Sequence, residues 1–309
     1  MRDALLRDLQ ALNRFDISCM CDARQPLSAL TQKNIIVKAG DDFNKAFKIA
    51  LKKADYVWII APETDGILLA LSEIAAESSA QLLGCGYDAT LTATSKSLSF
   101  DAMQAANIHT LAVHGGEDLM QQAYFDMMLQ LGISKWVAKP EDGAGCEGIR
   151  VFENLCDLRD WLKPNNQYLH YLVQPYQEGV AGSFSMLCRD SKGWLLSANQ
   201  QHIACDGKTF TLKGLTVNGM QQYWQRFETI ARKIAKMLPD AAGYIGVDVI
   251  VDTENDKIYV IEINPRLTTS YVGLREAIGC NPAQIILDCL LNASFNMPSI
   301  ARNKAEVHV

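Results

Sequence analysis

The chain has 309 residues, of which 49% are hydrophobic and 21% charged, and its formal net charge is −6. This length is too great for one small core and predicts a globular enzyme of two or three subdomains. The acidic balance, without a long Lys/Arg run, argues against nucleic acid or an anionic membrane as the main partner. No apolar run approaches the roughly 20 residues that span a bilayer.

The cysteines and the N-terminal residues indicate the cellular compartment. Nine cysteines are scattered along the chain, and the close pair Cys19 and Cys21 has no nearby histidine to complete a zinc site. Reduced, mostly buried thiols are therefore favoured over a disulfide or a metal role. The first twenty residues are amphipathic and charged rather than signal-like, so we expect no export and a cytoplasmic protein.

The N-terminal third alternates helix-like and strand-like segments, which predicts an open parallel sheet with helices on both faces. A doubly wound domain normally opens with a strand, whereas this chain opens with a helix. We expect that the natural start lies upstream of residue 1; the alternative is that the first strand is absent. Helices are expected at 2–13, 41–54 and 67–78, and strands at 16–19, 34–37, 56–61 and 81–84.

The remaining two thirds predict a glycine-rich loop between strands and then mostly antiparallel strands. The tail from Ser299 onward is polar, and we expect it to be loose. Helices are expected at 95–106, 156–162, 221–237 and 282–291, and strands at 136–139, 149–152, 168–174, 183–188, 194–200, 243–251 and 258–263.

Four polar side chains interrupt an otherwise apolar hairpin near the C-terminal end. If the turn spans 253–257, Asp248 lies opposite Glu262, with Asn264 on the same face and Arg266 just beyond. Buried like charges repel, so a cation should lie between the two carboxylates. Hard oxygen ligands on a rigid sheet suit Mg²⁺ that bridges the phosphates of a nucleotide.

The glycine-rich loop at 142–148 lies between two strands and lacks a Gly-Lys-Ser/Thr ending, so it is neither a P-loop nor a dinucleotide fingerprint. A glycine hairpin can instead close over polyphosphate and donate backbone N–H groups, although such hairpins are common. Lys139, on the strand that leads into the loop, points either to solvent or to an anion. The loop glycines considered for phosphate binding are Gly143, Gly145 and Gly148.

Two further segments are candidates for nucleotide contacts. Lys96 lies in the first turn of a helix capped by Thr94 or Ser95, where it is either exposed and tolerated or shares a phosphate with the helix terminus. The segment 168–179 reads as a strand that runs into a hinge, which can offer backbone groups to an adenine. It is otherwise an edge strand ended by Pro175.

Other polar residues carry weaker signals. The five histidines lack ligand spacing and are more often structural or exposed. Glu63 and Asp65 follow a strand, where α/β sheets place ligand-contacting loops. Either could face a substrate amine, but a turn-forming role is at least as frequent.

The order of these motifs resembles the ATP-grasp superfamily of carboxylate–amine ligases over about residues 85 to 292, and the first third looks like its preceding α/β domain. The segment 262–266, fourteen residues after Asp248, is the most specific part of the resemblance. Segments 61–68 and 264–273 look most like the tyramine–glutamate ligases of methanofuran-type cofactor biosynthesis.

The resemblance implies an α/β (α+β overall) ATP-grasp fold whose two α+β subdomains clasp ATP. An N-terminal Rossmann-like domain would span 1–90, linker helices and the lid subdomain 91–174, and the C-terminal subdomain with the metal site 175–309. The resemblance is also compatible with a homodimer.

The resemblance also implies roles for single residues. Lys96 and Lys139 would hold the α- and β-phosphates of ATP, and Arg266 would neutralise the transferred phosphoryl group or the acyl phosphate. The adenine would be framed by Gln174, Pro175 and Tyr176. One or two Mg²⁺ (or Mn²⁺) ions would be bound by Asp248, Glu262 and Asn264. Substrate contacts are expected from Thr268, Thr269, Ser270 and Tyr271.

Three departures from the family pattern concern the nucleotide. Cys146 and Glu147 stand in the glycine loop where many relatives carry small or hydroxylic residues. The helix starts Ser95-Lys96 instead of the frequent Asp-Lys. No glutamate precedes the strand at 183–188, so the ribose contact must come from elsewhere, with Glu178 as the candidate.

The sequence thus predicts an ATP-dependent ligase that joins a small carboxylate to an amine through an acyl phosphate. Glutamate and an aromatic amine such as tyramine are implied by the resemblance alone. The alternatives are an ATP-binding regulator or scaffold without ligase activity, and a carboxylase-type relative that phosphorylates bicarbonate. Against the last, the chain is short and shows no biotin-attachment segment.

Overall fold

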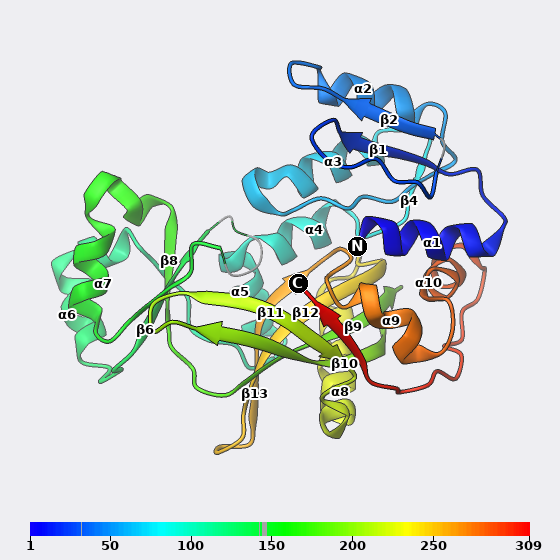
Figure 1. The fold of residues 1–309 in the computed structure, drawn as a ribbon. Coiled ribbons are helices and arrows are strands. Elements are labelled where there is room, and N and C mark those ends of the chain that lie inside the picture. The colour runs from blue at the N-terminus through cyan, green and yellow to red at the C-terminus, as the bar shows by residue number, and fades with distance from the viewer. Residues whose placement is uncertain (32, 142, 144–146) are drawn as a thin grey trace.

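The computed structural model describes residues 1–31, 33–141, 143 and 147–309. The chain forms three parts: an N-terminal α/β part, a lid that extends to one side, and a body built on a six-stranded sheet (Figure 1). Over the described residues, no helix is long and apolar enough to cross a membrane.

The N-terminal part consists of two small parallel sheets with helices beside them. Phe47 and Leu51 pack on Leu71 and Ala80 in a core of their own. Parallel pairing agrees with the sequence expectation, but the strands form two separate pairs instead of one open sheet. One reason is that the apolar run 56–61 pairs over only two residues. The elements are β1 (Ser18–Asp22), β2 (Lys33–Val37), α2 (Phe43–Leu51), β3 (Tyr56–Val57), α3 (Ile67–Ala76) and β4 (Gln81–Leu82).

The lid is a four-stranded antiparallel sheet in the order β5-β8-β6-β7, backed by two helices. Trp136, Leu158 and Val173 are almost fully buried in the core between the sheet and these helices. Its elements are β5 (His114–Gly115), α6 (Gln122–Leu129), β6 (Trp136–Pro140), β7 (Arg150–Phe152), α7 (Leu155–Leu162) and β8 (Tyr171–Pro175).

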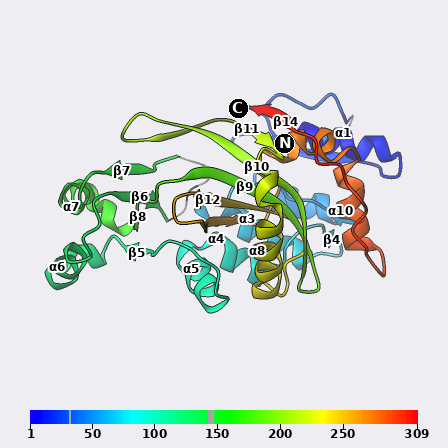
Figure 2. The same ribbon diagram turned by 90° about the horizontal axis from the view of Figure 1, so that it is seen from below.

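The body is a six-stranded antiparallel sheet in the order β13-β12-β9-β10-β11-β14. Two layers of helices cover its two faces, as the view from below shows (Figure 2). The strands are β9 (Val180–Arg189), β10 (Lys192–Cys205), β11 (Phe210–Val217), β12 (Gly243–Asp252), β13 (Lys257–Asn264) and β14 (Ala305–His308). One face carries α4 (Tyr87–Thr94), α5 (Lys96–Ala105) and α8 (Trp224–Met237); the other carries α1 (Arg2–Leu12), α9 (Tyr271–Ile278) and α10 (Pro282–Leu291).

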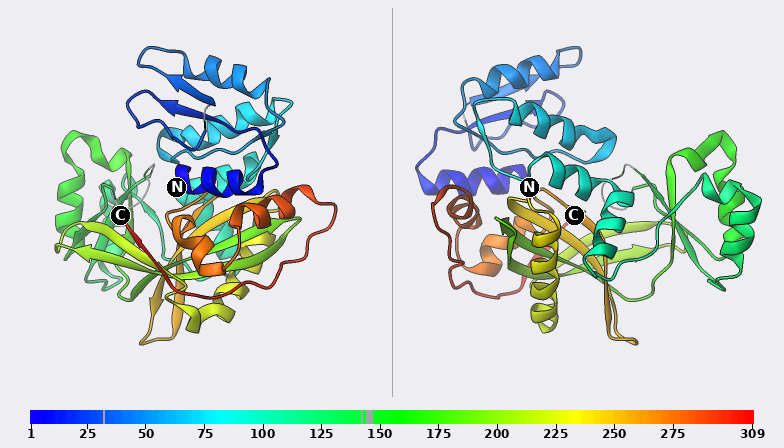
Figure 3. Two further views of the ribbon diagram at one scale, coloured as in Figure 1. Left: turned by 45° about the vertical axis from the view of Figure 1, so that its right-hand side comes forward. Right: turned by 180° about the vertical axis from the view of Figure 1, so that it is seen from behind.

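The first helix, α1, packs on the body and not on the N-terminal part. Its Ala4 and Leu5 share a core with α9 and α10, and Figures 1 and 3 show α1 beside these helices. Periodicity predicted this helix correctly but could not predict its partner. The subdomain boundaries 1–90, 91–174 and 175–309 stay predictions.

The expectation of a loose C-terminal tail is wrong for its last residues. β14 pairs antiparallel with β11, and its Ala305 and Val307 are buried while Glu306 and His308 are exposed. This four-residue alternation is the pattern of an edge strand with one buried face. The elements not predicted from the sequence are α4, α6, α9, β5, β11 and β14.

The metal-motif hairpin has the predicted pairing, with Asp248 opposite Glu262. The turn is one residue shorter than assumed, because Asp252 pairs with Lys257. A bulge between Asp248 and Val249 shifts the register by one residue and restores the expected partners. The prediction was therefore right at the carboxylates although its turn was wrong.

Candidate active site

A cavity of about 460 Å³ lies between the lid and the body. The lid sheet, the start of α5, strands β9 to β13 and the segment after β13 all contribute to its wall. Most of the predicted site residues line it: Lys96, Lys139, Gly143, Gln174, Pro175, Tyr176, Asp248, Glu262, Asn264, Arg266, Thr268, Thr269 and Ser270.

The two hairpin carboxylates face this cavity. Asp248 accepts hydrogen bonds from Asn264 Nδ2 at 3.0 Å and from Gln201 Nε2 at 2.7 Å. Burial raises the pKa of Asp248, although these two hydrogen bonds act in the opposite direction. Burial also raises the pKa of Glu262, to about 7, against the opposing effect of Lys96. In both cases the effect of burial is larger than the opposing effect of the hydrogen bonds and lysine charges around the carboxylate.

Gln201 was not found from the sequence. The strand expected at 194–200 ended one residue before it, and a single glutamine in a strand carries no motif signal. The longer β10 places it with its amide on Asp248, so its location depends on the pairing of β10 with its neighbours.

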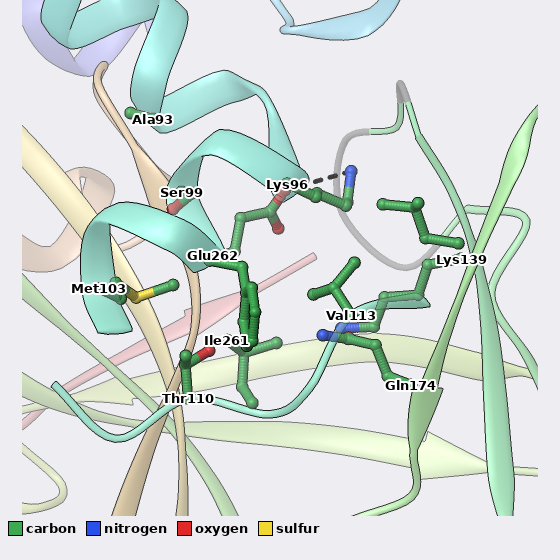
Figure 4. A pocket seen from close by; sticks show the side chains of 12 residues that line it. Ala93, Lys96, Ser99, Met103, Thr110, Val113, Lys139, Gln174, Ile261 and Glu262 are labelled. Atoms are coloured by element: carbon green, nitrogen blue, oxygen red, sulfur yellow. Dashed lines mark ion pairs between the residues drawn. The ribbon is translucent and has the colours of Figure 1, made fainter. Parts of the chain in front are cut away.

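Lys96 begins α5 behind the predicted cap, since Ser95 Oγ accepts from the backbone N–H of Leu98 at 3.3 Å. Its Nζ donates to the carbonyl oxygen of Glu141 at 2.8 Å and lies 3.9 Å from Glu262 Oε1. Figure 4 shows the ion pair between this ammonium group and Glu262 as a dashed line. Lys96 is therefore not simply an exposed, tolerated side chain.

Lys139 lies on β6, opposite Leu172 of β8. Together with Lys96, Gln174 and Glu262 it lines a smaller hollow of about 10 Å³, shown in Figure 4, and it also lines the main cavity. Its charge lowers the pKa of Glu262, though less than burial raises it. Lys139 from the lid and Lys96 from the start of α5 thus both approach the carboxylate pair.

The hinge residues form one wall of the cavity. The Tyr176 and Phe210 rings are parallel within 3° at a centroid separation of 6.5 Å, and Lys135 Nζ lies 5.7 Å from the Tyr176 centroid. Gln174 is buried. Glu178, the ribose candidate, is exposed and does not belong to the described lining of the cavity, so a ribose contact from it stays a prediction.

The glycine loop is only partly described. Gly143 and Glu147 line the cavity, whereas among the described residues Gly148 does not. Gly148 has φ +73°, and an added Cβ would meet Pro140 Cγ at 2.7 Å, so glycine is required there. Gly145 and Cys146 lie outside the described residues.

Arg266 forms a buried, bidentate ion pair with Glu63 of the N-terminal part. Nε lies 2.6 Å from Oε1 and Nη2 lies 2.5 Å from Oε2, with side-chain exposures of 12% and 7%. Arg266 Nη1 also donates to the carbonyl oxygen of Leu267 at 3.2 Å. Neither of the two roles considered for Glu63 from the sequence anticipated this pair, which joins residues 203 positions apart. Asp65 does occupy the turn, with φ 55°.

A cluster of hydroxyl groups lies beside Arg266. Tyr244 Oη is within 2.7–3.0 Å of Ser185, Thr268 and Ser270, and Thr268 and Ser270 also line the cavity. Tyr271, by contrast, is buried and its hydroxyl donates to Asp8 at 3.0 Å. The expectation that Tyr271 contacts substrate is therefore wrong, because its side chain points into the core between α1 and α9.

The donor set fits a divalent cation with oxygen ligands. Asp248 and Glu262 lie on adjacent strands with Asn264, and their burial leaves negative charge that a cation would compensate. Among the described residues, no group of three or more His, Cys, Asp or Glu side chains forms a metal cage. Two carboxylates and an amide would fill only part of the coordination shell of Mg²⁺, so phosphate oxygens of a nucleotide could supply further ligands.

Comparisons with known proteins identify the family of the chain. A family model described as an ATP-grasp domain matches residues 93–270, and a pre-ATP-grasp domain matches 15–90. A tyramine–L-glutamate ligase of Methanocaldococcus fervens is 32% identical over 244 residues, which are 78% of this chain and 69% of the relative. A tyramine–L-glutamate ligase of Methanocaldococcus jannaschii is 30% identical over 241 residues, which are 77% and 65% of the two chains.

A solved structure shows the same fold. Biotin carboxylase of Campylobacter jejuni, in a β-γ-ATP complex, superimposes with a TM-score of 0.78, covering 97% of this chain and 71% of that one at 17% identity. At this identity the likeness concerns the fold and says nothing of the substrates.

The chain belongs to the ATP-grasp family and is an ATP-dependent ligase. The predicted fold and family are confirmed, and its curated relatives carry the name of the branch that the sequence resembles. The alternative of a regulator without ligase activity is not favoured.

Proposed function

We propose that this ligase joins glutamate to tyramine or a related amine, in the cytoplasm, through an acyl phosphate. The observation that carries the proposal is the convergence of Asp248, Glu262, Lys96, Lys139 and Arg266 on one cavity between lid and body. The choice of substrates is supported by the names of the two relatives.

The residues of the chain would divide the work as follows. Lys96 and Lys139 would bind the phosphates of ATP, and the wall at 174–176 would hold the base. Asp248, Glu262 and Asn264 would hold Mg²⁺ or Mn²⁺, which neutralises phosphate charge when bound. Positioning and charge compensation dominate phosphoryl transfer, so little covalent chemistry is required of the protein.

Arg266, Thr268, Thr269 and Ser270 would receive the acid. A carboxylate oxygen of glutamate attacks the γ-phosphorus, the bond to the β-phosphate oxygen breaks, and ADP leaves. The amine then attacks the acyl carbon, phosphate leaves with the C–O bond pair, and the amine loses a proton. Closure of the lid over the cavity would limit the access of water to the acyl phosphate.

The test is mass spectrometry of the product formed from purified protein, ATP, Mg²⁺, glutamate and a mixture of biological amines. We expect a glutamyl amide, with ADP and phosphate released in equal amounts. The Glu262→Gln variant should lose on the order of 10²-fold or more in rate, as when other groups that stabilise transition-state charge are removed.

Different outcomes would point elsewhere. Amide formation with another acid would reject glutamate but keep the ligase. ATP binding without amine-dependent turnover over a broad panel would reject the proposal. A homodimer, with which the resemblance is compatible, stays a prediction and is checked by light scattering on the same sample.

A further inference from the structure

The loop that carries Glu63 is held in one conformation. Pro62 accepts a hydrogen bond through its carbonyl oxygen from the Leu68 N–H at 3.1 Å, and Gly66 N–H donates to the Glu63 carbonyl oxygen at 3.0 Å. Asp65 and Gly66 adopt positive φ values of 55° and 65°. Such a turn, at the start of α3, directs the Glu63 side chain away from solvent and onto Arg266.

The ion pair leaves part of the guanidinium available. Arg266 has five N–H donors. Two are used by Glu63, through Nε and Nη2, and one by the carbonyl oxygen of Leu267, through Nη1. Counting the described residues as partners, one N–H remains on each terminal nitrogen, on a side chain that lines the cavity. Two donors from one planar group suit the two oxygens of a carboxylate or phosphoryl group.

Without Glu63, Arg266 would have competing partners. Asp248 and Glu262 line the same cavity, and the charge of Arg266 already lowers the pKa of Asp248 in opposition to burial. A freed guanidinium would be drawn to these carboxylates, because buried opposite charges attract strongly in a medium of low dielectric constant. The guanidinium would then pair with the two carboxylates that are proposed to bind the metal ion.

We propose that Glu63 is a positioning residue of the ligase, which aims two N–H groups of Arg266 at the transferred phosphoryl group and keeps the guanidinium off Asp248 and Glu262. This inference rests on the proposed function. It assigns to the N-terminal part a direct influence on the reaction, exerted through one side chain of the body.

The first test is a kinetic double-mutant cycle with Glu63→Gln and Arg266→Lys. Glu63→Gln should lower kcat about 10- to 100-fold at saturating Mg²⁺–ATP, the range for a catalytic group displaced by about 1 Å. Glu63→Asp keeps the charge with a shorter reach and should recover part of this loss. In the Arg266→Lys background, Glu63→Gln should change kcat by less than about threefold, because a residue that acts through Arg266 has nothing left to position.

The matched control is Asp8→Asn, which breaks the ion pair between the buried Asp8 and the exposed Arg275 outside the cavity. It should leave kcat within about twofold of wild type, while thermal unfolding reports its effect on folding. A kcat of Glu63→Gln close to that of wild type would overturn the inference. An equally large loss in both Arg266 backgrounds would also overturn it.

The second test does not depend on the ligase reaction. Binding of Mn²⁺ in the presence of ADP, followed by electron paramagnetic resonance, should weaken about 10-fold in Glu63→Gln, the lower limit for loss of an outer-shell partner. The double variant Glu63→Gln/Arg266→Met also lacks the guanidinium, and its Mn²⁺ affinity should return to that of wild type. If wild type forms no amide with any substrate, but the variants show these changes in Mn²⁺ affinity, the proposed function fails and the positioning role stands. Unchanged Mn²⁺ affinity in Glu63→Gln rejects the role.

Discussion

Gly246 shows how closely the sheet approaches the substrate segment. It lies opposite Asn264 on β13 and Ser185 on β9. A Cβ added to Gly246 would lie 2.3 Å from Thr268 Cγ2 and 2.8 Å from Thr268 Oγ1. Any larger residue must displace Thr268, which lines the cavity and contacts the Tyr244 hydroxyl at 2.9 Å.

We therefore expect Gly246→Ala to impair both folding and turnover. Overpacking at a buried site costs about 1–3 kcal/mol of unfolding free energy. The shift of Thr268 should also raise the KM for the acid, because Thr268 belongs to the proposed acid site. Chemical denaturation and initial rates measure the two effects.

Gly84→Ala is the matched control for Gly246→Ala. An added Cβ at Gly84 meets nothing within 4 Å, so this variant should stay within about 0.5 kcal/mol of wild type. If Gly246→Ala behaves like this control, Thr268 moves aside without cost and the close approach has no functional meaning.

The roles of single residues could be predicted from the sequence where several polar residues lie close together in one motif. The metal-binding candidates could be predicted because burying oxygen-bearing side chains in an apolar hairpin costs free energy unless they are paired or bind a metal. These residues are Asp248, Glu262 and Asn264. Gln201 and the role of Glu63 could not be predicted, because their partners are 47 and 203 positions away and are brought close only by the assembled fold. The sequence therefore shows the ligands of a site more readily than the residues that hold them.

Helix α1 is fixed to the body by a buried carboxylate. Asp8 accepts from Tyr271 Oη at 3.0 Å and from Arg275 Nη1 at 2.9 Å, and its carbonyl oxygen accepts from Asn281 Nδ2 at 2.8 Å. Burial raises the pKa of Asp8 above its ordinary value of 3.8, although both side-chain partners oppose the shift. The folded protein therefore holds this proton more tightly than the unfolded chain.

This shift predicts a pH-dependent difference between wild type and Asp8→Asn. The stability from the raised pKa is fully present below pH 3.8 and is lost as the pH rises through the pKa of the folded state. Wild type should therefore lose unfolding free energy relative to Asp8→Asn as the pH is raised from about 4 to 7. Thermal unfolding of both proteins over this range measures the difference; a constant difference would show that the pKa is not raised.

The hairpin between β10 and β11 connects the body to the lid. Lys208 accepts through its carbonyl oxygen from the Val151 N–H at 2.9 Å, and Thr209 forms an isolated bridge with Arg150 of β7. Figure 2 shows this hairpin reaching over the lid. Asp206 fixes its tip by accepting from the backbone N–H groups of Lys208 at 2.9 Å and Thr209 at 2.7 Å.

Loosening this tip should weaken nucleotide binding. Asp206→Ala removes the acceptor that orders the tip, so the cavity wall at Phe210 would have to be ordered when ATP binds. We expect ATP to bind about threefold to tenfold more weakly, the range for ordering a few side chains on association. Calorimetric titration measures the affinity. Asp41→Ala, which removes a turn acceptor for the Lys38 N–H in the N-terminal part, is the control and should bind ATP like wild type.

The elements that could be predicted were those with long, regular patterns. Helix α8 was expected because its apolar positions Trp224, Phe227, Ala231 and Ile234 recur at helical spacing. Helix α9 was not expected, because it begins directly after the polar substrate segment and spans only eight residues. β14 carried a readable alternation, but a four-residue signal gains meaning only from β11 beside it.

At the scale of the whole molecule, all three parts meet at the cavity. The lid contributes Lys139 and the body contributes the carboxylates to its wall, whereas Glu63 of the N-terminal part reaches it through its ion pair with the lining residue Arg266. Figure 3 shows the N-terminal part above the body and the lid to its side. The contacts of Arg266 with Glu63 and of Lys96 with Glu141 and Glu262 join opposite charges or a donor and an acceptor, so the charge of the bound nucleotide should affect all three parts.

The combined effect of nucleotide and metal on stability tests this arrangement. Lys96 lies 3.9 Å from Glu262, and the negative charge of Asp248 raises the pKa of Glu262 in addition to burial. A divalent cation would compensate both carboxylates, whereas ATP alone would add negative charge beside them. We therefore expect ATP with Mg²⁺ to raise the unfolding free energy by about 2.7 kcal/mol at 100 times its Kd, and ATP with EDTA to raise it much less.

The Glu262→Gln variant should keep or raise the stability of the nucleotide-free protein and should lower the additional stabilisation by Mg²⁺. Glutamine removes a half-buried charge, on a side chain that is 23% exposed, with little change of shape, so the nucleotide-free variant should be at least as stable as wild type. It also removes a metal ligand, so the additional stabilisation by Mg²⁺ should nearly vanish while the response to ATP with EDTA remains. Thermal unfolding of both proteins without ligand, with ATP and Mg²⁺, and with ATP and EDTA separates these effects. A variant that is less stable without ligand, yet keeps the full Mg²⁺ response, would mean that Glu262 stabilises the fold and that the cation binds elsewhere.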